Sequence, residues 1–125
     1  MIELSRLVKS FSHALRGVRV AFKTEQSFRI QIGIAFFVLL FAFFFQIQAF
    51  EWIVLLLLVE SVLILELINS IFERIIDTFK PRIHPVVRDI KDIMAGVVLL
   101  GSLISLFVGI TIFFPHVLEL VRSLA

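Results

Sequence analysis

The polar residues that could carry out chemistry in this chain are concentrated in the segment ELINSIFERIID, residues 66–77. The segment follows a long apolar run and contains Glu66, Asn69, Glu73 and Asp77. On a helix, at about 100° per residue, Glu73 and Asp77 each lie within about 20° of Glu66, and Asn69 lies about 60° away. The four side chains therefore share one helix face and follow one another in depth.

Carboxylates on one face repel one another unless cations lie among them. Mg²⁺ fits such a face, since in proteins it takes oxygen ligands from one or two carboxylates and from substrate phosphates. The alternative is a solvated helix end whose charges pair with Arg74, Lys91 and their neighbours. That alternative accounts for Glu73 and Asp77 but not for Glu66, which lies more than a turn deeper in the apolar run. A charged residue at that depth is costly and indicates a functional site.

Three apolar runs must position this face, at about residues 30–49, 52–71 and 93–114. Each approaches the ~20 residues that a helix needs to cross a hydrocarbon core of ~30 Å. The chain is 60% hydrophobic, well above the roughly 45–50% apolar content of soluble domains. The sequence therefore predicts an all-α integral membrane protein with three spans, forming a single domain over residues 1–125. A cleavable signal peptide is the alternative for the first run, but residues 1–29 are charged and offer no convincing cleavage site.

Several familiar chemistries are excluded by the sequence. The chain has no cysteine, so it has neither disulfides nor thiolate metal sites. Its five glycines are scattered and form no phosphate-binding loop, and its three histidines show no zinc-binding spacing. A bound nucleotide would therefore be held by charged side chains and through its metal ion.

The basic residues are distributed unevenly along the chain. Residues 1–29 contain six Lys and Arg and the polar segment 72–92 contains five, whereas residues 46–51 contain none and the C-terminal tail has only Arg122. Because segments rich in Lys and Arg stay in the cytoplasm, we expect the N-terminus and residues 72–92 on the cytoplasmic side. The turn at 46–51 and the C-terminus are then expected outside.

Residues 3–23 are predicted to form an amphipathic surface helix. Apolar residues recur there at spacings of three and four, and basic residues occupy much of the remaining surface. A helix of this kind lies in the membrane interface, where anionic headgroups attract it. A plain anchor with solvated charges is the alternative.

The third span has a face of small residues. Gly101, Ser105 and Gly109 recur at every fourth position, which lets a neighbouring helix approach closely. Two prolines interrupt any helix between the second and third spans, the third span is expected to begin after Lys91 and Asp92, and Pro115 is expected to end it.

The motif Glu-x-x-Asn-Ser-x-x-Glu-x-x-x-Asp, followed fourteen residues later by Lys-Asp, resembles the prokaryotic diacylglycerol kinase family. The resemblance covers nearly the whole chain. The segments KSFSHALRG, His-Pro at 84–85 and IFFP look more like the Gram-positive undecaprenol kinase branch. The resemblance implies a small homotrimeric lipid kinase that phosphorylates a membrane lipid alcohol with ATP and Mg²⁺. Undecaprenol is the first candidate substrate and diacylglycerol the alternative.

The resemblance also implies roles for individual residues. Glu66 would contact the lipid hydroxyl and take its proton as general base, supported by Asn69 as a second catalytic residue. Glu25 and Glu73 would hold Mg²⁺. The residues implied in nucleotide binding are Arg6, His13, Glu25, Glu73, Asp77, Arg82, His84, Lys91 and Asp92. The implied location is the bacterial cytoplasmic membrane, and the implied partners are ATP, the lipid alcohol, the anionic membrane surface and further copies of the chain, with no nucleic acid.

Three residues depart from the family pattern. Ile71 and Phe72 stand where the family prefers smaller side chains, and Glu60 lies in the middle of the second span. Glu60 is about 240° behind Glu66 in helical phase, so it cannot share the catalytic face. A silent membrane scaffold would not need the whole charged set. An ion-conducting oligomer, suggested by Glu60 and Glu66 at depth, would leave Glu25 and the Lys-Asp pair unexplained.

Overall fold

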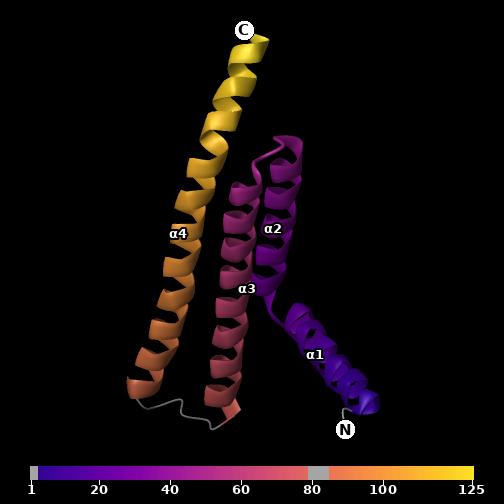
Figure 1. The fold of residues 1–125 in the computed structure, drawn as a ribbon. Coiled ribbons are helices and arrows are strands. Elements are labelled where there is room, and N and C mark those ends of the chain that lie inside the picture. The colour runs from indigo at the N-terminus through magenta and orange to yellow at the C-terminus, as the bar shows by residue number, and fades with distance from the viewer. Residues whose placement is uncertain (1–2, 79–84) are drawn as a thin grey trace.

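The computed structural model describes residues 3–78 and 85–125. In chain order it contains the helices α1 (Leu4–Thr24), α2 (Gln26–Phe44), α3 (Ala49–Thr78) and α4 (Pro85–Leu124) (Figure 1). The helices α2, α3 and α4 are long and apolar enough to cross a membrane. The predicted all-helical class and the three predicted spans are therefore confirmed.

The helix α3 lies between α2 and α4 in the bundle, while α1 leaves the bundle at an angle (Figure 1). The end of α3 and the start of α4 lie at the same end of the molecule as α1. The connection between α2 and α3 lies at the opposite end, and the C-terminus extends beyond it. The polar segment 66–77 therefore points toward the end where α1 meets α2.

The break between α1 and α2 is a single residue, Glu25. Its extended backbone ends α1, and its N–H still donates to the carbonyl of Ala21 at 2.8 Å. The Arg29 guanidinium donates to the carbonyls of Phe22 and Lys23 at 3.0 and 3.1 Å. These bonds satisfy carbonyls that the end of a helix leaves without partners, and they hold α1 at a fixed angle to α2.

The turn between α2 and α3 is closed by a cap and a small apolar cluster. Gln46 adopts a left-handed backbone with φ of 50°, and the Gln48 N–H donates to the Glu51 carboxylate at 2.8 Å, as in half of a capping box. Beneath the turn, Ala42, Ile47 and Leu55 are buried together. The α2–α3 hairpin is thereby fixed at the end opposite to the polar segment.

The small-residue face of α4 has two different surroundings. A Cβ atom at Gly101 would lie 2.7 Å from Leu65 Cδ1, so glycine is what lets α3 and α4 approach there. Ser105 and Gly109 instead line an apolar groove, and a Cβ at Gly109 would meet nothing within 4 Å. The predicted close approach is therefore confirmed at Gly101, whereas at Gly109 no helix of the described residues approaches and the approach stays a prediction.

The predicted start and end of the third span do not coincide with the start and end of the helix α4, so the prediction that Pro115 ends this helix is wrong. The helix α4 begins at Pro85, before Lys91 and Asp92, and continues through Pro115 to Leu124. Proline fits the first turn of a helix because its missing N–H needs no partner there. Within a helix it removes one backbone bond but keeps a helical φ of about −65°. Beyond Pro115 the helix is tied to α3, since His116 Nε2 lies 3.2 Å from Glu51 Oε2.

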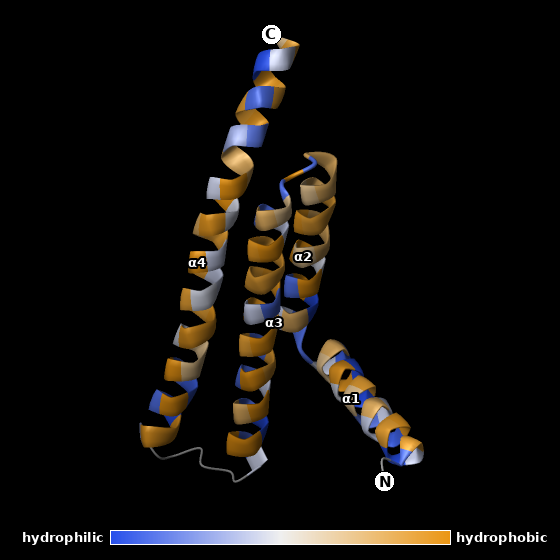
Figure 2. Cartoon of the chain, in the orientation of Figure 1, coloured by the Kyte–Doolittle hydropathy of each residue, from blue (hydrophilic) through white to orange (hydrophobic). Residues whose placement is uncertain are grey.

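Hydrophobic residues occupy most positions along the three long helices (Figure 2). Few of these side chains are buried by the chain itself, and α4 has no buried residue. Water would not tolerate so large an apolar surface on a monomer, whereas hydrocarbon does. The chain is an integral membrane protein.

Candidate functional site

The site is built around Glu66, on the side of α3 that faces α2. Its side chain is buried, with 6% of its surface exposed, and the neighbouring Asn69 and Ser70 are buried too. The Glu66 carboxylate accepts a hydrogen bond from Gln31 Nε2 of α2 at 3.1 Å. Glu66 is therefore buried within the chain itself, and α2 supplies a partner for it.

One turn further along α3, Asn69 and Glu73 form the next layer. Asn69 Nδ2 donates to Glu73 Oε1 at 3.2 Å. Glu66 lies close enough to both Glu73 and Glu25 for the charges to interact. The predicted grouping of Glu66, Asn69 and Glu73 on one face is confirmed, and Glu25 joins them from the junction of α1 and α2.

Three buried polar atoms at this face have no hydrogen-bond partner within residues 3–78 and 85–125. They are Gln31 Oε1, Asn69 Oδ1 and Ser70 Oγ. A buried polar atom without a partner costs about 1–3 kcal/mol, so such atoms are rare in folded proteins. Their presence around Glu66 indicates a face that receives polar groups from a ligand.

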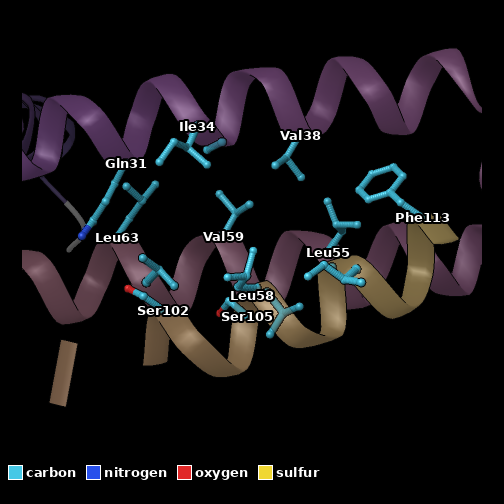
Figure 3. Close-up of a pocket in the computed structure, with 15 residues that line it drawn as sticks. Gln31, Ile34, Val38, Leu55, Leu58, Val59, Leu63, Ser102, Ser105 and Phe113 are labelled. Carbon is cyan, nitrogen blue, oxygen red and sulfur yellow. The ribbon is translucent and has the colours of Figure 1, made fainter. Parts of the chain in front are cut away.

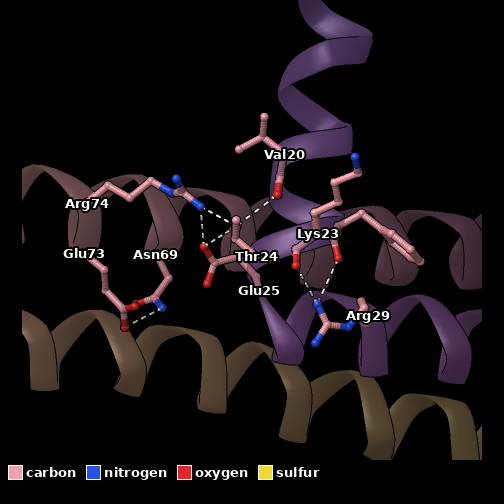
Figure 4. A network of polar contacts seen from close by, with 9 residues as sticks. Val20, Lys23, Thr24, Glu25, Arg29, Asn69, Glu73 and Arg74 are labelled. Carbon is pink, nitrogen blue, oxygen red and sulfur yellow. Dashed lines mark hydrogen bonds and ion pairs between the residues drawn. The ribbon is translucent and has the colours of Figure 1, made fainter.

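An arginine connects this face to the break between α1 and α2 (Figure 4). Arg74 Nη2 donates to Glu25 Oε1 at 2.7 Å and also to the Thr24 hydroxyl. The Thr24 hydroxyl in turn donates to the carbonyl of Val20 at 2.9 Å. Arg74 therefore holds Glu25 against α3, although the solvated-end alternative expected it to pair with Glu73 or Asp77.

Beyond Glu73, the site meets the start of α4. Lys91 Nζ donates to Asp77 Oδ1 at 2.5 Å, and Asp92 follows it on α4 as an exposed residue. This ion pair joins two positions that were predicted to bind nucleotide. It is also the pairing that the solvated-end alternative expected for Asp77, so that alternative holds here and not at Glu66.

Of the remaining predicted nucleotide residues, Arg6 and His13 are not gathered at this face within one chain. Arg6 and His13 are exposed on α1, where Arg6 pairs with Glu3 at 2.5 Å, toward the far end of the helix from Glu25 (Figure 1). Arg82 and His84 lie outside the described residues. Their roles stay predictions.

The oxygen atoms at this face suit Mg²⁺. Within the described ranges, no three acidic or histidine side chains gather to form a metal site of their own. Mg²⁺ does not need one, because it is usually bound by one or two carboxylates together with substrate phosphates. Glu73 and Glu25 supply carboxylates, and Asn69 Oδ1 is an unpaired oxygen beside them. The residues therefore fit a Mg²⁺ ion that arrives with a nucleotide.

An apolar groove of about 480 Å³ lies between α2, α3 and α4 (Figure 3). Gln31 lies at the end nearest Glu66, and Leu55 and Phe113 lie at the other end. Apart from Gln31, Ser102 and Ser105, its lining is apolar. Gln31 both lines this groove and donates to Glu66, so the buried carboxylate lies next to a space that suits a hydrocarbon chain.

Gln31 is the residue that the sequence reasoning missed. It contacts Glu66 and also lines the groove. The signal was available, because Gln31 is a polar side chain near the start of the first apolar run. It was not linked to Glu66, since only the packing of α2 on α3 brings the two residues together.

Comparison with known proteins gives a consistent result. Residues 12–113 match the family described as prokaryotic diacylglycerol kinase. The undecaprenol kinase of Bacillus subtilis is 35% identical over 113 residues, which cover 90% of this chain and 92% of that protein. The diacylglycerol kinase of a Synechocystis species is 35% identical over 91% of this chain and 66% of its own length. The diacylglycerol kinase of Escherichia coli K12 is 25% identical over 90% of this chain and 92% of its own.

Proposed function

Because the chain belongs to the prokaryotic diacylglycerol kinase family and is a membrane lipid kinase, we propose that it transfers the γ-phosphate of ATP to undecaprenol, giving undecaprenyl phosphate. The observation that carries this proposal is Glu66, a buried carboxylate held by Gln31 at the end of an apolar groove. A lipid alcohol cannot leave the bilayer, so the group that accepts its proton has to lie at the depth of its hydroxyl.

Glu66 acts as the general base in this proposal. The lipid hydroxyl oxygen attacks the γ-phosphorus, its proton passes to Glu66, and the bond from the γ-phosphorus to the bridging oxygen breaks, releasing ADP. Positioned bases of this kind contribute about 10²–10⁴-fold to a rate. The Gln31 amide keeps one carboxylate oxygen engaged, which orients the other toward the hydroxyl.

Glu73 and Glu25 would hold Mg²⁺, with Asn69 beside them. Bound there, the ion would neutralise charge on the phosphates, which is the main requirement of phosphoryl transfer. The unpaired Asn69 Oδ1 supports this assignment. Arg74, which holds Glu25 in this structure, lies where a cation can also face the phosphates.

The nucleotide would be bound by Asp77, Lys91 and Asp92, with Arg6, His13, Arg82 and His84 as further contacts. This arrangement requires the start of α4 and the basic helix α1 on the cytoplasmic side, where ATP is found. We place α1 on the anionic membrane surface, in agreement with its exposed apolar and basic residues. Further copies of the chain, as a homotrimer, would bring the remaining contacts to each site.

Diacylglycerol is the second candidate substrate. The Synechocystis relative is named a diacylglycerol kinase, and its identity to this chain equals that of the Bacillus undecaprenol kinase. Undecaprenol is preferred because the Bacillus relative combines 35% identity with a match over 92% of its length, whereas the Escherichia coli diacylglycerol kinase, matched over the same share, is 25% identical. The apolar groove accommodates the hydrocarbon chain of either lipid.

The test is transfer of labelled γ-phosphate from ATP and Mg²⁺ in mixed micelles, with undecaprenol and diacylglycerol offered separately. We expect undecaprenol to be phosphorylated well above diacylglycerol. The reverse preference would overturn the assigned substrate and leave the mechanism. Absence of transfer to either lipid by the folded protein would contradict the kinase mechanism itself.

A further inference from the structure

Arg74 is a cation inside the candidate site, and it contacts one of the two carboxylates proposed to hold Mg²⁺. Arg74 Nη2 donates to Glu25 Oε1 at 2.7 Å and also to the Thr24 hydroxyl (Figure 4). The Thr24 hydroxyl oxygen lies 3.0 Å from the same Glu25 oxygen. One oxygen of a proposed metal ligand is therefore engaged by the chain's own groups.

The charge on this face is balanced by Arg74. Glu66 lies close enough to Glu73 and Glu25 for the three carboxylates to interact. Within the described residues, the side-chain bonds that Glu66 and Glu73 accept come from neutral amides, and only Glu25 forms an ion pair, with Arg74. Arg74 therefore supplies beside Glu25 the positive charge that a metal ion would also supply.

Arg74 has further donors beyond those that hold Glu25. A guanidinium carries five N–H donors, and both contacts use Nη2, while Nε and Nη1 donate to no group within residues 3–78 and 85–125. The segment 79–84 contains no Asp or Glu. The Arg74 side chain is 49% exposed. Because a guanidinium matches the geometry of a phosphate with two parallel bonds, the remaining donors suit a phosphate group.

Resting on the proposed kinase function, we propose that Arg74 exchanges partners when the nucleotide binds. Without nucleotide it pairs with Glu25; when ATP and Mg²⁺ bind, it leaves Glu25 to the metal and donates to the phosphates. Two cations on one carboxylate oxygen would repel each other, so Glu25 holds either Arg74 or the metal. The exchange also separates Arg74 from Thr24, the last residue of α1.

The alternative is that Arg74 is a permanent clamp, which keeps Glu25 in position for the metal. The two roles predict opposite effects on metal binding. Loss of a clamp lets Glu25 move and weakens metal binding, whereas loss of a competing cation strengthens it. The structure favours exchange, because an ion pair that is 49% and 22% exposed on its two side chains contributes little to stability and is easily broken.

The test measures binding directly on the purified full-length protein in detergent. Mn²⁺ alone is titrated without nucleotide, with free Mn²⁺ followed by its paramagnetic resonance signal. A fluorescent, non-hydrolysable ATP analogue is then titrated with Mg²⁺ and followed by anisotropy. The variant is Arg74→Met. The matched control is Arg88→Met, which removes the same charge from an exposed position in the first turn of α4.

We expect opposite changes in Arg74→Met. Mn²⁺ should bind about threefold tighter or more, because the competing charge is gone, and the ATP analogue should bind about tenfold more weakly, because a charged hydrogen bond is lost. Arg88→Met should leave both affinities within about twofold of the parent, since exposed charges are screened by salt. Weaker binding of both ligands in Arg74→Met would identify a clamp and overturn the exchange, as would equal changes in the two variants.

Arg74→Lys tests the phosphate contact in a variant that keeps the charge. Lysine retains a cation beside Glu25 but lacks the planar pair of donors. Mn²⁺ affinity should therefore stay near that of the parent, and only the affinity for the ATP analogue should fall. An unchanged affinity for the analogue would overturn the phosphate contact. A parent protein that binds no analogue would instead overturn the proposed function, and this inference with it.

Discussion

Glu60 and Glu66 are six residues apart on the same membrane helix, and their surroundings differ completely. Glu66 faces α2, is buried and accepts a hydrogen bond from Gln31. Glu60 faces away from the bundle and has no bond within the described residues. A carboxylate at depth is therefore not by itself a catalytic residue. The two carboxylates differ in their neighbours. Among the described residues, Glu66 has a polar partner, Gln31, and that partner also lines an apolar groove.

The largest effect is expected at the proposed Mg²⁺ site on the Glu66 face of α3. Chelating Mg²⁺ should abolish phosphate transfer, and Glu73→Gln should lower it by about 10²-fold or more, since the phosphate charge is then poorly neutralised. The measurement is the initial rate of transfer as a function of Mg²⁺ concentration.

The matched control for Glu73→Gln is Glu119→Gln, an acidic position near the C-terminus of α4. It should keep the parental rate and Mg²⁺ dependence. Activity in the presence of excess chelator would contradict the role given to the carboxylates of Glu25 and Glu73.

The next largest effect is expected from loss of the hydrogen bond between Gln31 and Glu66. Gln31→Leu removes the donor to Glu66, and since hydrogen bonds to charged groups contribute about 1.5–3 kcal/mol, the rate should fall by roughly 10- to 100-fold. The loss should appear in kcat more than in the KM for ATP, because Gln31 contacts the base and not the nucleotide site.

Gln48→Leu serves as the control for Gln31→Leu. Gln48 lies at the opposite end of α2 and α3, and its hydrogen bonds at the start of α3 within the described residues are made by backbone atoms: its N–H donates to Glu51 and its carbonyl accepts from the Trp52 N–H. Its replacement should leave kcat unchanged. An equal loss in the two variants would show that Gln31 acts only through general stability.

Gly101 and Gly109, two of the three glycines of α4, test the packing of α4 on α3. Gly101→Val forces the flexible end of the Leu65 side chain to move, because a Cβ would lie 2.7 Å from its Cδ1, and the two further methyl groups of valine overpack the contact at a cost near the low end of about 1–3 kcal/mol. Gly109→Val meets open space and should be tolerated. Half-lives of thermal inactivation in detergent compare the two, and equal half-lives would contradict the packing of α4 on α3.

The smallest effect is expected for the contact between His116 and Glu51, at the end of the bundle opposite to the candidate site. His116→Ala removes the contact with Glu51, and since partly exposed ion pairs contribute only about 0–1 kcal/mol, stability should change slightly and the transfer rate not at all. The same thermal and kinetic measurements apply. A large loss of activity would show that the extension of α4 past Pro115 communicates with the site.

Much of the fold could be predicted from the sequence because membrane spans are defined by length and hydrophobicity alone. The ends of the helices were harder to predict. Pro115 predicted a helix end, but proline is compatible with a helical φ and the chain continues through it. The small-residue stripe predicted one close contact, and the structure places Gly101 against Leu65 but Gly109 in a groove. Which face of a small-residue stripe is covered depends on the tilt between two helices, which spacing does not specify.

The candidate site, too, has a part that the sequence could predict and a part that it could not. Residues on one helix face, Glu66, Asn69 and Glu73, could be grouped from helical phase. The contribution of Gln31 and the hold of Arg74 on Glu25 could not, because both are contacts between helices. Helical phase separates Glu60 from the face of Glu66, but only the placement of the helices around α3 shows that Glu60 has no partner among residues 3–78 and 85–125.

The most direct test of the contrast between the two carboxylates is the rate of γ-phosphate transfer to undecaprenol by Glu66→Gln and Glu60→Gln, measured side by side in the same micelles. Glu66→Gln loses the general base, so we expect its rate to fall by about 10²–10⁴-fold. Glu60→Gln changes an exposed side chain that faces away from Gln31 and Glu66, and it should retain a rate within about threefold of the parent. Equal losses in the two variants, or a Glu66→Gln variant that remains active, would contradict the assignment of Glu66 as the base.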